Sequence, residues 1–161
     1  MPSKRHRPFI VSRKTVTRPI FACVYSVQQG RCWVEIPTLD NGNEQDPMCT
    51  HALDGPWTQP HEHDCELQIL HGQQSDTFRI FCKNHILLRE NETVKAVVGE
   101  EYHWCGSIVI MRAGKGEKKW VVNMQGRWDA VLADYALDQF IKHVQQRKRF
   151  SFSKRLVFHM P

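Results

Sequence analysis

The sequence predicts an α+β domain, in which a mainly antiparallel sheet of about six to eight short strands is covered by one C-terminal amphipathic helix. Strand-like apolar runs fill most of the chain, turn-forming residues separate neighbouring runs, and a single run with helical periodicity follows near the end. Because strands come first and do not alternate with helices, an antiparallel sheet is favoured over a doubly wound one. A small β-barrel with an appended helix is the alternative that this order leaves open.

Three pairs of strand-like runs flank turn residues, and the first and the last pair are predicted to form hairpins. The paired runs are 20–27 with 32–36, 66–71 with 77–82, and 107–111 with 119–124. Two shorter runs, 85–88 and 93–98, are further strand candidates. The helix is predicted over 129–146, where Asp138 and Lys142 stand at i,i+4 and apolar residues recur on one face: Ala133, Leu137, Phe140, Ile141 and Val144.

The chain of 161 residues, 41% of them hydrophobic, has the length and composition of one domain. We expect a basic arm over 1–19, a globular domain over 20–146 with a long loop at 37–60, and a basic-aromatic segment over 147–161. No apolar run reaches the roughly 20 residues of a membrane helix, and the basic start lacks the apolar core of a signal peptide. We therefore expect an intracellular protein, nuclear or cytoplasmic, whose six cysteines are thiols or metal ligands.

Charge is distributed unevenly along the chain. The ranges 1–20 and 142–155 hold twelve of the 22 basic residues and no acid, which leaves ten basic residues against all 17 acids in the middle. Such basic ends predict an acidic partner, most plausibly nucleic acid, whose phosphates lysine and arginine neutralise. The residues expected to make these contacts are Lys4, Arg5, Arg7, Arg147, Lys148, Arg149, Lys154 and Arg155.

Aromatic residues interleave with the basic ones after the predicted helix. Phe150 and Phe152 are candidates for stacking on unpaired bases, and the neighbouring run 156–158 fits a last core strand. The stretch 146–158 also resembles the basic-aromatic effector segment of the MARCKS family, which binds acidic membranes and calmodulin. That resemblance implies binding at a membrane surface, with Ser151 and Ser153 as phosphorylation switches.

Histidine and cysteine cluster beside the predicted long loop. Imidazole nitrogen and thiolate sulfur suit zinc, and five such residues occur within a short stretch: Cys49, His51, His61, His63 and Cys65. If the end of this stretch is extended, its alternate residues share one face, so zinc is the candidate cofactor. A polar loop with incidental histidines is the competing interpretation. Trp57, in the same loop, is a candidate ligand contact.

Part of this cluster resembles the first metal-binding motif of the cupin family. The residues are Gly55, His61, His63, Glu66 and Gly72, with a spacing one residue short after His63 and no second motif after Gly99. In that family two histidines and a glutamate hold a metal inside a small β-barrel, so the resemblance implies a barrel and a metal held by His61, His63 and Glu66.

No nucleophile elbow, phosphate-binding loop or dinucleotide fingerprint is present, which favours a protein that is not an enzyme. Three functions follow from the sequence: a non-catalytic interaction module whose basic ends bind nucleic acid, a metal-dependent or zinc-stabilised domain built on the Cys49–Cys65 cluster, and a domain that pairs with another protein.

Overall fold

The computed structural model describes residues 15–40, 45–47, 63–83, 85–115, 120–146 and 155–161. Its elements confirm the α+β class, with strands first and a long helix near the end. In chain order they are β1 (Thr15–Ser26), β2 (Gly30–Asp40), β3 (Gln45–Pro47), β4 (His63–His71), β5 (Gln74–Cys82), α1 (Glu92–Val98), β6 (Ile108–Ala113), β7 (Val121–Val122), α2 (Gly126–Gln146) and β8 (Leu156–His159).

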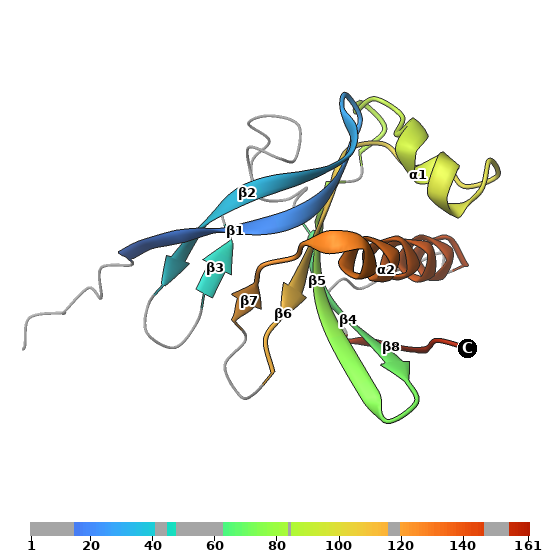
Figure 1. The fold of residues 1–161 in the computed structure, drawn as a ribbon. Helices are drawn as coiled ribbons and strands as arrows, with labels where there is room; N and C mark the ends of the chain where they lie inside the picture. Colours follow the sequence, from blue (N-terminus) through green and yellow to red (C-terminus); the bar gives the residue numbers. More distant parts are fainter. Residues whose placement is uncertain (1–14, 41–44, 48–62, 84, 116–119, 147–154) are drawn as a thin grey trace, which may run out of the picture.

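The strands form one sheet in the order β3-β2-β1-β6-β5-β4-β8, with β7 paired to β6 beside this path. Each pair is antiparallel except β4 and β8, which run parallel. The sheet is open, because the short strands β3 and β8 lie at its opposite edges and do not pair with each other (Figure 1). The barrel alternative is therefore wrong, and so is the barrel that the cupin resemblance implied.

Both predicted hairpins are confirmed, and the two strand-like runs at 66–71 and 77–82 also form one. In the first, Ser26 pairs with Gly30, and the Ser26 hydroxyl accepts hydrogen bonds from the backbone N–H groups of Gln28 and Gln29 (3.1 and 3.2 Å). In the β4–β5 hairpin a two-residue turn contains Gly72 at φ +61°, a backbone conformation that favours glycine. The third hairpin joins β6 to β7, which is much shorter than the predicted strand.

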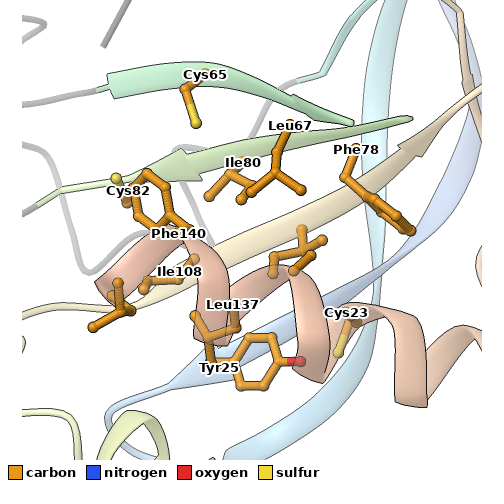
Figure 2. Packing of buried hydrophobic residues seen from close by; sticks show 14 of the residues in the cluster. Cys23, Tyr25, Cys65, Leu67, Phe78, Ile80, Cys82, Ile108, Leu137 and Phe140 are labelled. Carbon is orange, nitrogen blue, oxygen red and sulfur yellow. The ribbon is translucent and has the colours of Figure 1, made fainter. Parts of the chain in front are cut away.

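Alternation of side chains along the strands gives the sheet two apolar faces. The face beneath α2 carries the larger cluster, in which strand residues such as Leu67, Ile80 and Ile108 pack with Leu137 and Phe140 of the helix (Figure 2). The opposite face carries a second buried cluster: Ala22, Val24, Ile36, Phe81, Val109, Met111 and Val121. The central strands β1, β5 and β6 contribute to both clusters, which makes them the most buried part of the sheet.

Helix α2 begins three residues before the predicted start. The Asp129 carboxylate accepts a hydrogen bond from the backbone N–H of Gln125 (2.8 Å), which places a negative charge at the helix N-terminus. The predicted i,i+4 pair forms, with Lys142 Nζ 2.7 Å from Asp138 Oδ1. In the part of the chain that the structure describes, no helix has the length and apolar character needed to cross a membrane.

Two predicted strands are wrong. Residues 93–98 belong to helix α1, because the Asn91 side chain caps the first turn by accepting from the N–H groups of Thr93 and Val94. Residues 85–88 form a turn closed by a hydrogen bond from Leu88 N–H to His85 O (2.8 Å), which leaves Ile86 89% exposed. Both runs are rich in branched apolar residues, which is why they resembled strands.

The ends of the sheet lie partly in segments predicted to be irregular. Strand β1 begins at Thr15, inside the predicted basic arm. Strand β2 continues to Asp40, and Thr38 pairs with Pro47 of β3, so part of the predicted loop 37–60 is sheet. Residues 156–159 form β8, which confirms the last core strand. The basic residues of 147–154 therefore lie in the connection between α2 and β8, outside the described residues.

Candidate anion-binding notch

A notch opens where strands β5 and β6 diverge. The two strands pair from Cys82 and Ile108 as far as Phe78 and Arg112, and beyond that point the β4–β5 and β6–β7 hairpins separate (Figure 1). The cavity between the hairpin ends has a volume of about 610 Å³, within the range of sites that bind small ligands or single groups of larger ones. Its polar side chains include Gln68, Gln73, Gln74, Ser75 and Thr77.

Three of the described cations, from two separate parts of the chain, line this notch. Arg112 is on β6, Lys115 follows the end of that strand, and Arg155 immediately precedes β8. Among the described residues of the lining, cations outnumber the one acid, Asp76, and Arg112 and Arg155 also pair with Asp129 and Glu66 outside the lining. Arg155 and Lys115 are exposed, although the Arg155 Nε atom also lies 3.0 Å from Glu66 Oε1. An arrangement of this kind can accept an anion whose oxygens receive hydrogen bonds from guanidinium and ammonium groups.

The Arg112 guanidinium is held in place by two carboxylates. Its Nη1 atom donates to Asp129 Oδ1 (3.0 Å), and its Nη2 atom donates to Asp76 Oδ1. The second oxygen of Asp76 lies 2.8 Å from His71 Nε2. These contacts use two of the five guanidinium N–H donors and fix the orientation of the others, and the side chain keeps partial access to solvent.

The same contacts keep Asp76 ionised. Burial alone would raise the pKa of its carboxyl, but the hydrogen bonds from His71 and Arg112 and the charge of Arg112 outweigh burial and lower the pKa below its ordinary value. A carboxylate stabilised as an anion is a weak proton acceptor at neutral pH. The chemistry that this network supports is positioning of Arg112, not proton transfer.

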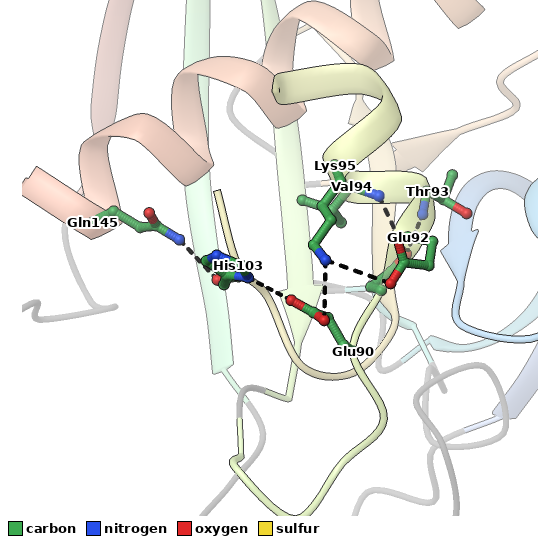
Figure 3. A network of polar contacts seen from close by, with 8 residues as sticks. Glu90, Glu92, Thr93, Val94, Lys95, His103 and Gln145 are labelled. Carbon is green, nitrogen blue, oxygen red and sulfur yellow. Dashed lines mark hydrogen bonds and ion pairs between the residues drawn. The ribbon is translucent and has the colours of Figure 1, made fainter. Parts of the chain in front are cut away.

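A second polar network joins the two helices at the other end of the sheet (Figure 3). Glu90 contacts Lys95 Nζ (3.0 Å) and His103 Nδ1 (2.5 Å), and Gln145 of α2 donates to the His103 carbonyl (2.7 Å). Hydrogen bonds from His103 and Lys95 lower the pKa of the Glu90 carboxyl. Because His103 and Gln145 are exposed and Glu90 is partly exposed, we interpret the network as a surface contact that orients α1 against α2.

The predicted zinc ligands are only partly within the described residues. Cys49, His51 and His61 lie outside them, as does Trp57. His63 is the first residue of β4, and Cys65 is buried in the core, where burial first and the charges of Asp64 and Glu66 second raise its pKa to about 12. Among the residues that the structure describes, no group of three or more histidine, cysteine, aspartate or glutamate side chains could hold a metal. The zinc site stays a prediction.

Burial predicts which thiols react. In native protein at about pH 8 we expect alkylation to spare Cys65 and Cys82, whose pKa values burial raises, and to modify the half-buried Cys105 faster. After unfolding, all three should react alike. Mass-spectrometric mapping of the alkylated peptides measures this, and rapid labelling of Cys82 in the folded protein would contradict its placement in the core.

Of the residues predicted to contact nucleic acid, Arg155 lines the notch. The others, and Phe150 and Phe152, lie outside the described residues: Lys4, Arg5, Arg7, Arg147, Lys148, Arg149 and Lys154. No family model matches the chain, and no curated protein or solved structure is detectably similar to it. The assignment of a site therefore rests on the geometry of the described residues.

Sequence reasoning missed the centre of this site. Arg112 and Asp76 are 36 residues apart and meet only because β5 and β6 are paired in a particular register. A single arginine at the end of an apolar strand run was the available signal, and it does not identify its partners. Lys115 lies between the two runs of the third predicted hairpin, and its place in the notch depends on the neighbouring β4–β5 hairpin, which the sequence does not place.

Proposed function

We propose that the protein is a non-catalytic module that binds nucleic acid through the cationic notch and the basic stretches next to it. The observation that carries the proposal is the convergence of Arg112, Lys115 and Arg155 on one open cavity. Their ammonium and guanidinium groups have the chemistry that neutralises phosphates in protein–nucleic acid complexes.

The distribution of charge along the chain supports the same function. Lys115 adjoins a turn whose sequence contains Lys118 and Lys119, and Arg155 follows the basic stretch 147–154. Lys115 and Arg155 therefore each have further basic residues close to them in the sequence. The acids of the chain lie between its basic ends in the sequence, so positive charge is concentrated in those ends.

A double variant, Lys115→Gln with Arg155→Gln, tests the proposal. Loss of two phosphate contacts is expected to weaken binding to a labelled oligonucleotide by about ten-fold and to reduce the slope of log affinity against log salt by about 1.5. Fluorescence anisotropy between about 50 and 200 mM salt measures both quantities.

The matched control is Arg89→Gln, which removes an exposed arginine that precedes α1 at the opposite end of the sheet. It is expected to leave the affinity and the salt slope close to those of the unmodified protein. Equal weakening by the control and the double variant would show that general charge, and not the notch, determines binding.

A further inference from the structure

Exposed apolar side chains lie at the start of the second strand of the β6–β7 hairpin, where Val122 of β7 lines the notch and Trp120 immediately precedes the strand. In the β6–β7 hairpin Arg112 pairs with Val122, Ala113 pairs with Val121, and the Gly114 N–H donates to Trp120 O (2.5 Å). This register places Trp120, Val122 and Arg112 on one face of the sheet, because alternate residues share a face. Trp120 and Val122 are each 38% exposed, whereas Val121 is buried in the opposite face.

A second exposed tryptophan comes from α2. Trp128 is 56% exposed, and its neighbour Asp129 binds Arg112. Seven residues later, two turns along the helix, the Tyr135 hydroxyl donates to the His159 carbonyl of β8 (2.9 Å). Trp128 therefore lies on the flank of α2 that faces the β4–β8 half of the sheet, the half that forms one wall of the notch.

Core packing does not account for these two rings. Trp104 is a tryptophan of the core, for comparison: its side chain is 1% exposed and packs edge-on against Phe140, with ring centroids 5.7 Å apart. Trp120 and Trp128 are instead 38% and 56% exposed. The Trp120 carbonyl binds the N–H of Gly114, and Asp129, next to Trp128, binds Arg112; both Gly114 and Arg112 line the notch. Exposed apolar surface concentrated at one place is typical of a binding site.

We propose that the notch and the two tryptophans form one surface that selects single-stranded over double-stranded nucleic acid. This inference rests on the proposed function and names its substrate class. Unpaired bases can stack on an exposed indole ring while the adjacent phosphates contact Lys115 and Arg155. The bases of a duplex are already stacked on one another and cannot use Trp120 or Trp128.

The experiment compares Trp128→Ala with Trp33→Ala, which removes an exposed tryptophan from β2 on the other side of β1. The probes are an oligothymidylate of about 15 nucleotides, a duplex of the same length, inorganic polyphosphate and poly-glutamate. Trp128→Ala is expected to weaken oligothymidylate binding by about ten-fold and to leave polyphosphate binding unchanged. Trp128→Phe should restore most of the loss, and Trp33→Ala should have no effect.

The outcomes separate the two proposals. Equal affinity for single strand and duplex, or equal weakening of polyphosphate and oligothymidylate by Trp128→Ala, overturns the stacking inference and leaves the proposed function standing. If the unmodified protein binds neither polyphosphate nor oligothymidylate, the proposed function and the stacking inference are both overturned. Binding of poly-glutamate as tight as that of oligothymidylate would point to an acidic protein partner and also overturn both. Quenching of tryptophan fluorescence by oligothymidylate but not by polyphosphate is the independent supporting result.

Discussion

Replacing Asn91 by alanine is expected to lower the free energy of unfolding by about 3 kcal/mol, the largest effect that we predict. The side chain is fully buried, and its Nδ2 atom donates to the carbonyls of Tyr25 and Gly106 (2.9 Å each). Its Oδ1 atom accepts from Thr93 and Val94, so each hydrogen-bonding position of the amide is occupied. Alanine removes the cap of α1 and the two donors that bind strand carbonyls.

Urea denaturation of the variant at neutral pH measures this effect. The control is Glu92→Ala in the same helical turn, where an exposed side chain is removed and a change within about 0.5 kcal/mol is expected. A destabilisation by Asn91→Ala no larger than that of the control would contradict the role of Asn91 as the residue that joins α1 to β1 and to the start of β6.

Replacing Asp76 by asparagine is expected to lower the free energy of unfolding by about 2 kcal/mol at pH 7. Asparagine keeps the shape of the side chain but removes the negative charge that balances Arg112 and His71 at the notch. The cost stays below that of a fully buried pair because Arg112 retains partial contact with water. The substitution should also let the Arg112 side chain change its orientation, which would weaken binding of an anion that contacts this guanidinium.

The pH dependence follows from the direction of the pKa shift. The folded-state pKa of Asp76 lies below its unfolded value, so the carboxylate contributes stability that is present above the unfolded pKa and is lost as the pH falls through the folded pKa. The free energy of unfolding that Asp76→Asn loses relative to the unmodified protein should therefore stay the same from pH 7 down to about pH 4 and shrink only below that pH. Asp138→Asn, which removes an i,i+4 helix pair with Lys142, is the control and should cost about 0.5 kcal/mol. A deficit that vanished already at about pH 6 would contradict the assignment to Asp76.

The sheet and the long helix could be predicted because their signals are local. Turn residues between strand-like runs located the hairpins, and the apolar stripe that includes Leu137 and Phe140 located α2. Helix α1 could not be predicted in the same way. Its valines favour a strand, and the side chain that caps it, Asn91, is also fixed by a carbonyl 66 residues away. Tertiary contacts therefore decided between helix and strand.

The sequence predicts that basic residues contact an acidic partner, but it could not predict where in the fold the notch lies. The basic ends indicated a polyanion, and Arg155 belonged to that prediction. The notch itself depends on strand order, because β5 lies next to β6 in the sheet and their hairpins diverge beyond Phe78 and Arg112. Nothing local to Arg112, Lys115 or Asp76 reveals that register. The sequence also does not distinguish Trp120 and Trp128 from core residues, and their exposure in the fold identifies them as surface residues.

The most direct test of the central claim is the affinity of the unmodified protein for a labelled single strand of about 15 nucleotides, measured between about 50 and 200 mM salt. A cationic notch that neutralises phosphates predicts tight binding at low salt, with log affinity falling linearly against log salt at about 0.7 per contact, so that three notch contacts give a slope near −2 or steeper. Absence of binding at low salt, or binding whose affinity does not change with salt, would contradict the proposal that this protein recognises a nucleic acid through its basic residues.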